Sequence, residues 1–265
     1  MADYIALRKG RNALSTVLHI VLNISLAVFS TALTVISHTW VFGVLLVLLS
    51  KWRVVAVRPR YWWINIKANL VDFTVGISLA LLVYMAGADS VEGLTAWHII
   101  LTAIYAIWLV IIKPRSETIM TEAQAMFAVF FGSYASVLAT SQLNPLVGVA
   151  ACFVIGYGAS RHVLIQGDDH DFTLTTFICG LLMAEMSWIF YHWTIIYRFG
   201  ESASFVIPQL PIATSVLFFM FARGYKSALR HDGKIRADDI VIPAIFSVLV
   251  MFVMVFFFSV ASFDI

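Results

Sequence analysis

The acid at position 185 is the residue whose surroundings most suggest chemistry. Glu185 is the one charged residue in a stretch of 22 residues, Phe172 to Trp193. At about 1.5 Å per residue, a helix of this length crosses a bilayer core. A carboxylate in hydrocarbon is unfavourable unless it is protonated or paired. We therefore expect Glu185 to face the interior of a helix bundle and to bind a ligand or a proton.

Five further side chains are candidates to line a pocket with Glu185, and they lie on three different apolar stretches: Trp188, His192, His19, Asn23 and His98. Helical spacing puts the first two on the face of Glu185. The next two belong to a polar stripe with a spacing of three to four residues, which should face protein. One interpretation of this pattern is a polar binding pocket that opens outward. The alternative is structural, with a protonated Glu185 hydrogen-bonded to a neighbouring helix.

The densest polar cluster is a short loop formed by four consecutive residues: Asp168, Asp169, His170 and Asp171. Three carboxylates and an imidazole could hold a hard divalent cation. Their spacing matches no known ligand pattern, and an aspartate directly before a helix commonly caps it. Capping is therefore the favoured interpretation and metal binding the weaker one. Nucleotide-binding, zinc-protease and serine-hydrolase motifs are absent from the sequence, so no cofactor is predicted.

The elements that position these residues are expected to be membrane helices. Apolar residues make up 61% of the chain and charged residues 12%, whereas a soluble domain has about twice that charged share. Residues 1–265 are therefore predicted to form a single integral membrane domain in the lipid bilayer. A net charge of +2 gives no reason to expect a nucleic-acid partner. Cys152 and Cys179 both lie in apolar stretches and predict no disulfide framework.

Hydropathy predicts an all-α transmembrane bundle with about nine spans. Residues 13–51 are too long for one span and should form two, joined by a tight turn near Ser37 to Thr39. The other spans are expected at about residues 68–86, 95–112, 120–139, 145–164, 172–193, 207–222 and 240–262. This arrangement puts 16 of the 17 Lys and Arg residues on one side, with Arg198 alone on the other. Because basic loops stay in the cytoplasm, the N-terminus is predicted inside and the C-terminus outside.

A basic and aromatic segment, residues 51–67, follows the second predicted span. It contains five cations among Trp and Tyr residues, a composition typical of a segment that lies in the membrane interface. We call it the basic segment and expect it to bind anionic lipid headgroups. Asp72, just inside the next span, is expected to cap that helix or to pair with Lys67 or Arg60.

Small residues recur at every fourth position in three spans. The sets are Gly148, Cys152, Gly156 and Ser160; Ala128, Gly132, Ser136 and Thr140; and Gly76 and Ala80. Such faces let helices approach closely. Because three spans share the pattern, packing within the chain is the favoured interpretation. A homo-oligomer formed through these small-residue faces is the alternative.

Three segments carry a resemblance to a known group of proteins. They are KWRVVAVRPRYWWINIKANLVD at residues 51–72, GYGASRH at 156–162 and YHWT at 191–194. With these segments, most of the chain resembles uncharacterised multi-span membrane proteins of Saccharibacteria-like bacteria. The resemblance implies a location in the bacterial inner (cytoplasmic) membrane. It carries no activity and no site residues with it.

Three classes of function are therefore left by the sequence. A small permease or ligand-binding bundle would use the pocket around Glu185, and this class is favoured. A structural, assembly or lipid-organising membrane protein would use the small-residue faces and the basic segment. A metal-dependent lipid-modifying enzyme would use the loop 168–171, but no motif supports it. The environment of Glu185 decides between the first two classes, because a Glu185 that faces lipid would favour the second.

Overall fold

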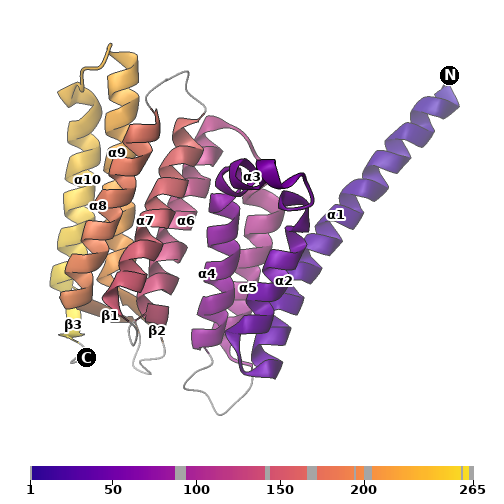
Figure 1. Cartoon of the computed structure of the whole chain (residues 1–265), viewed down its shortest axis with the longest axis horizontal. Coiled ribbons are helices and arrows are strands. Elements are labelled where there is room, and N and C mark those ends of the chain that lie inside the picture. The colour runs from indigo at the N-terminus through magenta and orange to yellow at the C-terminus, as the bar shows by residue number, and fades with distance from the viewer. Residues whose placement is uncertain are drawn as a thin grey trace.

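The computed structural model describes residues 2–86, 94–140, 144–165, 172–193, 195–199, 205–257 and 259–262. The chain is all-α except for one small sheet, and its long helices lie side by side, with successive ones running in opposite directions (Figure 1). The helices are α1 (Ala2–Ser37), α2 (Trp40–Ser50), α3 (Trp62–Ala68), α4 (Leu70–Ala86), α5 (Ala96–Ile107), α6 (Thr118–Thr140), α7 (Pro145–Leu164), α8 (Phe172–His192), α9 (Gln209–Arg230) and α10 (Ala237–Phe257). A π-helical turn, η3 (Trp108–Ile112), continues α5.

The helix ends follow from local chemistry. The predicted turn between the first two spans is confirmed, because α1 ends at Ser37 and His38 adopts a positive φ of 50°. Thr39 then caps α2, with its side-chain oxygen accepting a hydrogen bond from the backbone N–H of Val41. In the same way Asn144 caps α7, and its side-chain oxygen accepts from the N–H of Leu146.

Several helices are suited to a membrane. Among the described residues, five helices are long and apolar enough to cross one: α1 from Leu14 onward, α6, α7, α8 and α10. Residues 59–68 and α4 would add a sixth as one span bent by 69°. The shorter helices α2 and α5–η3 are also apolar. The positions of the helices therefore agree with the predicted spans, whereas the count of nine and the orientation of the termini stay predictions.

Small side chains bring the helices together inside the chain. Cys152, Gly156 and Ser160 of α7 are buried, and a Cβ atom added at Gly156 would lie 2.6 Å from Cγ of Met183 on α8. Gly132 of α6 is equally close to α4, since its added Cβ would lie 2.8 Å from a methyl carbon of Thr74. Packing within the chain is therefore what these small-residue faces do in this structure.

A small sheet at one end of the bundle was not predicted. Strand β1 (Ile195–Phe199) pairs antiparallel with β2 (Phe205–Pro208) on one side and with β3 (Ser259–Ser262) on the other. Tyr134 of α6 donates its hydroxyl hydrogen to the backbone carbonyl of Val206 at 2.5 Å. This bond ties the sheet to the central helix α6. Tyr197 of β1 is fully buried and adds an apolar anchor.

Candidate functional site

Asp72 is the centre of the most strongly charged buried contact among the described residues. Lys51, at the C-terminal end of α2, forms an ion pair with Oδ2 of Asp72, and Lys113 approaches the same oxygen at 2.8 Å. The indole N–H of Trp108 donates to Oδ1 of Asp72 at 3.4 Å. We call these four residues the Asp72 cluster. It joins α2, α4 and the end of η3 through side chains that are far apart in the sequence.

The side chains of the Asp72 cluster differ in how much of their surface is exposed. The side chain of Lys51 is 5% exposed and that of Asp72 is 15% exposed, whereas that of Lys113 is 42% exposed. Burial, together with the neighbouring charge of Lys113, lowers the pKa of Lys51 to about 8, and the attraction of Asp72 opposes this shift. Buried charges are tolerated only when they are paired. Two cations share one carboxylate here, so the cluster carries excess positive charge on its solvent side.

The π-helical turn explains how two groups of one helix reach Asp72. The backbone N–H of Lys113 bonds to the carbonyl of Trp108, five residues earlier, at 2.8 Å. Residues five apart lie close to one face of a π-helix but far apart around an α-helix. The wider turn therefore lets Trp108 and Lys113 approach Asp72 together. Such turns are frequent at functional sites.

A second set of polar contacts fixes the same end of the bundle. Gln124 of α6 donates to the carbonyl oxygens of Ile112 at 2.8 Å and Arg115 at 2.7 Å, which satisfies acceptors left free at the end of η3. The amide oxygen of Gln124 lies 2.7 Å from Nε2 of His162 on α7. The ends of η3, α6 and α7 are thereby held together beside the Asp72 cluster.

An open apolar groove runs down the bundle from this end. Its volume is about 450 Å³, and α4, α6 and α7 form its walls. The lining residues are Leu70, Phe73, Thr74, Ile77, Ser78, Leu81, Gly132, Ala135, Ser136, Ala150, Ala151, Val154 and Ile155. Phe73 connects the groove to the Asp72 cluster, since Nζ of Lys51 lies 5.9 Å from the centre of its ring.

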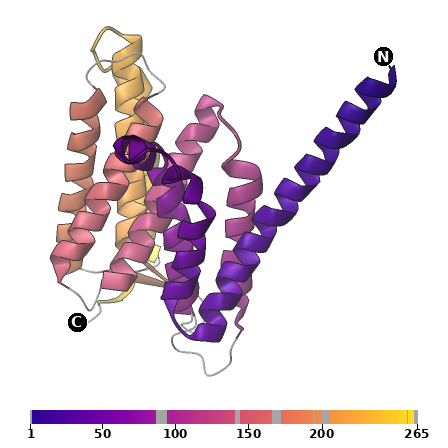
Figure 2. The same ribbon diagram turned by 45° about the vertical axis from the view of Figure 1, so that its right-hand side comes forward.

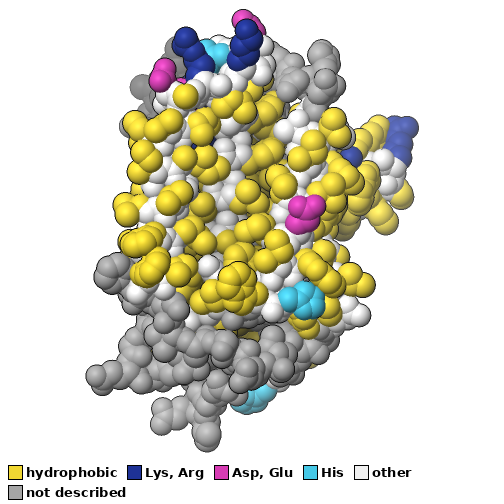
Figure 3. Space-filling model, turned by 90° about the vertical axis from the view of Figure 1, so that its left-hand side faces the viewer, with side chains coloured by type: hydrophobic (Ala, Val, Ile, Leu, Met, Phe, Trp, Pro, Cys, Tyr) yellow, Lys and Arg dark blue, Asp and Glu magenta, His cyan; other side chains and the backbone are white. Residues whose placement is uncertain are grey.

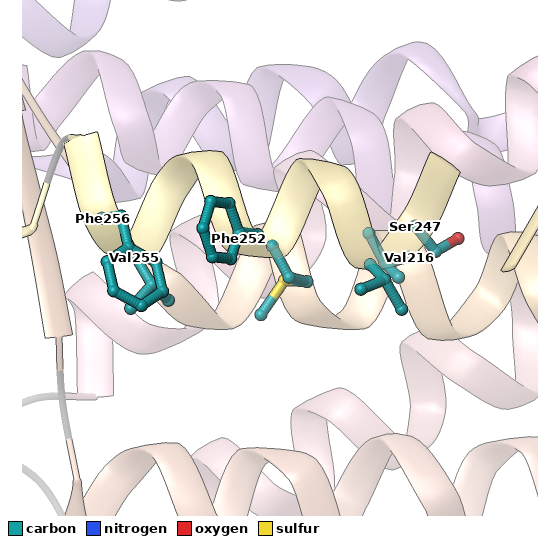
Figure 4. A pocket seen from close by; sticks show the side chains of 7 residues that line it. Val216, Ser247, Phe252, Val255 and Phe256 are labelled. Atoms are coloured by element: carbon teal, nitrogen blue, oxygen red, sulfur yellow. The ribbon is translucent and has the colours of Figure 1, made fainter. Parts of the chain in front are cut away.

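A second groove, of about 380 Å³, lies between α9 and α10. Figure 4 shows Phe252, Val255 and Phe256 of α10 along it, with Ser247 and Val216 at one end. The hydroxyl oxygen of Ser247 is buried and has no hydrogen-bond partner among the described residues. Apart from this hydroxyl the groove offers only apolar side chains, so it can hold hydrocarbon but is poorly equipped to recognise a polar ligand.

Glu185 does not face the interior, so that prediction is wrong for the single chain. Its side chain is exposed, and α8 packs against α7 and α9 through its opposite side. The smaller residues Gly180, Ala184 and Ser187 take the buried positions because they allow close approach to α7. Trp188 and His192 are exposed as well and lie edge to face, with ring centres 4.6 Å apart. Figure 3 shows an acidic side chain amid hydrophobic ones on one face of the bundle.

The other predicted pocket residues lie elsewhere. On α1, the amide nitrogen of Asn23 is 3.1 Å from Nδ1 of His19, and α1 packs against α2, α4 and α5. His98 of α5 is buried, and its Nδ1 accepts a hydrogen bond from the backbone N–H of Thr95 at 2.9 Å, as part of a capping box. The described residues therefore form no pocket that brings α1, α5 and α8 together around Glu185.

The metal prediction stays untested. Residues 168–171 lie outside the described residues. Within the described part of the chain, no group of three or more His, Cys, Asp or Glu residues is placed to hold a metal ion.

The partners of Asp72 were predicted incorrectly. They are Lys51 and Lys113, not Lys67 or Arg60. This pairing could have been inferred from the sequence. Lys51 and Lys113 each follow a predicted span that ends on the side of the membrane where the helix of Asp72 begins. In the basic segment Arg53, Arg58 and Arg60 are exposed as expected, whereas Lys51 is buried in the cluster.

Comparison with known protein families, curated proteins and solved structures finds no match. The class that the fold and composition define is a helical one, with several apolar helices compatible with an integral membrane protein.

Proposed function

We propose that the chain is a lipid-organising protein of the bacterial inner membrane that holds an anionic phospholipid of the cytoplasmic leaflet. In this proposal the chain crosses the membrane nine times, with its N-terminus inside and its C-terminus outside. The cations of the basic segment contact the lipid phosphate, and one acyl chain occupies the groove between α4, α6 and α7.

The groove between α4, α6 and α7 is the main observation in support of this proposal. Along α4 it extends from Leu70 to Leu81, a rise of about 16 Å at 1.5 Å per residue. One leaflet contributes about half of a hydrocarbon core that is about 30 Å thick. The groove therefore matches the depth of one leaflet. Its walls are apolar, so a hydrocarbon chain fits it better than a polar substrate does.

The headgroup would be held where α4 begins. Leu70 follows the basic segment by only three residues, and the helix axis bends by 69° between them. Arg53, Arg58 and Arg60 are exposed, and each cation near an anionic surface contributes about 1 kcal/mol of attraction. Nζ of Lys67 lies 5.5 Å from the ring centre of Trp63, an arrangement suited to the headgroup region.

A small permease is the second candidate, and the Asp72 cluster is the observation that favours it. Ionisable groups buried in membrane helices commonly serve transport, and this cluster sits beside a π-helical turn. Glu185 no longer supports a permease, because it is exposed on α8. An enzyme that uses residues 168–171 has no observation in its favour among the described residues.

Lipid retention tests the proposal. The protein is purified in mild detergent from membranes that contain phosphatidylglycerol, and bound lipid is counted by native mass spectrometry. Ala150→Phe should fill the groove and reduce bound lipid at least about tenfold, equivalent to 1.4 kcal/mol. The triple variant R53Q/R58Q/R60Q should lose anionic lipid selectively. Ala150 is exposed, so the added ring does not disturb the core.

Leu146→Phe is the matched control. It adds a ring at an exposed position on the same helix, about one turn away and outside the groove. It should retain lipid like the wild type. Equal lipid counts in Ala150→Phe and Leu146→Phe would refute the groove as a lipid site.

A further inference from the structure

Glu185 lies in an unfavourable environment in the single chain. It is the fourteenth of 21 residues in α8, one of the helices apolar enough to cross a membrane. Its side chain is exposed, and its neighbours Leu181 and Ile189 are 43% and 50% exposed. An acid facing lipid at this depth is costly when it is ionised, so a polar partner on this face of α8 would stabilise it.

The exposed face of α8 has the spacing of a helix-packing seam. Its members follow one another in steps of four, three, four, three and four residues: Leu174, Ile178, Leu181, Glu185, Trp188 and His192. This alternation keeps the six side chains on one face of the helix, where a second helix can cover them. The face is therefore built to receive one helix, with Glu185 as its polar position.

A helix of suitable chemistry is left uncovered on the far side of the same chain. Residues 14–22 of α1 are all exposed, although Ala27, Ser30 and Thr34 further along α1 are buried. The N-terminal half of α1 leaves the bundle at an angle, and α1 and α8 lie at opposite sides of the molecule (Figures 1 and 2). His19 lies in this exposed stretch, and Asn23, one turn further along the apolar span, is half-buried.

We propose that the exposed face of α8 binds residues 14–23 of α1 from a second copy of this chain. The two surfaces are different and lie at opposite sides, so the contact is heterologous and builds a ring or a row of copies. Each copy then covers the α1 of one neighbour and the α8 of the other.

The polar groups of the two surfaces are complementary. The side-chain amide nitrogen of Asn23 carries two hydrogens; one can be donated to Nδ1 of His19, 3.1 Å away, and the other to a carboxylate. Glu185 supplies that carboxylate. Both helices end at the same end of the bundle (Figure 1), Glu185 seven residues before the end of α8 and Asn23 fourteen before the end of α1. The inclination of α1 reduces this difference in depth.

Cross-linking between differently tagged copies tests the contact. Cys152 and Cys179 are first replaced by alanine. Leu22→Cys on α1 in one copy and Leu182→Cys on α8 in the other place thiols at exposed positions beside the polar residues. A short bis-maleimide should join these copies in membranes. Val248→Cys on α10, which is 69% exposed, replaces Leu182→Cys in the control and should give no dimer.

Two variants test the polar pairing. Glu185→Leu should reduce the Leu22–Leu182 cross-link at least about tenfold, while Glu185→Gln, which still hydrogen-bonds, should retain most of it. The double variant H19L/N23L should cause the same loss from the other surface. Because Glu185 is exposed, the Leu variant should keep the thermal stability of the folded chain.

Three outcomes of these experiments would overturn the proposed contact. Cross-links between two copies that both carry Leu182→Cys, in place of the mixed dimer, would show a two-fold α8 contact. No cross-link in any combination would show that α1 of a second copy does not lie on this face of α8. A mixed dimer that persists undiminished in Glu185→Leu would show that the acid does not form the contact.

Discussion

Removing one charged member of the Asp72 cluster should destabilise the fold. Removing two should destabilise it by less than the sum of the two single changes. Asp72→Asn leaves Lys51, with a side chain only 5% exposed, without its counter-charge. Breaking a fully buried pair costs about 3–5 kcal/mol. We expect about 2–3 kcal/mol here, since Lys113 is 42% exposed and can be hydrated. Asn still accepts the hydrogen bond from Trp108.

A double-mutant cycle measured by thermal unfolding in detergent tests this expectation. At about 2–4 °C per kcal/mol, Asp72→Asn should lower Tm by about 5–10 °C. Lys51→Met should cost less, because Asp72 keeps Lys113 as a partner. The double variant D72N/K51M should recover at least about 1 kcal/mol relative to the sum of the single changes. Additive effects within about 0.5 kcal/mol would refute the cluster as a coupled unit.

Three further predictions concern packing, pH and orientation. Gly156→Ala should lower the stability of the fold by about 1–3 kcal/mol, because its Cβ would lie 3.1 Å from the carbonyl oxygen of Cys179. Gly224→Ala, whose Cβ has its nearest neighbour at 3.9 Å, should instead stabilise the fold by about 0.5–1 kcal/mol. Equal Tm shifts in the two variants would contradict this prediction. Burial lowers the pKa of Lys51 to about 8, so the folded chain binds fewer protons than the unfolded chain between pH 8 and the ordinary pKa of 10.5. Stability should rise across that window, and the rise should flatten in Lys51→Met if Lys51 causes it. In intact cells an impermeant thiol reagent should label His38→Cys but not Lys234→Cys, and the reverse pattern would invert the proposed topology.

Helix positions were predictable from sequence because hydropathy and capping residues act locally. The turn at Ser37 to Thr39 and the start of α7 at Pro145 both carry their signals in a few adjacent residues. The sheet was missed because its strands, such as Ile195–Phe199, are short and pair with partners that include β3, distant in the sequence. Pairing of that kind leaves little local signal.

The candidate site was harder to predict, for two different physical reasons. Periodicity on α8 shows which residues share a face, but it does not say which face turns inward. The inward face was decided by the close approach of small residues such as Gly180, and Glu185 was turned outward. The Asp72 cluster required knowing that the ends of α2, α4 and η3 meet, which is a property of tertiary packing.

Photolabelling by a phospholipid tests the central claim most directly. Membranes that contain the protein and phosphatidylglycerol with a diazirine in one acyl chain are irradiated, and labelled peptides are mapped by mass spectrometry. The groove account predicts concentrated labelling at residues 70–81, 132–136 and 150–155, which is lost in Ala150→Phe. Labelling spread evenly over exposed apolar positions such as Ile242 and Ile245 of α10, with no preference for the groove, would contradict it.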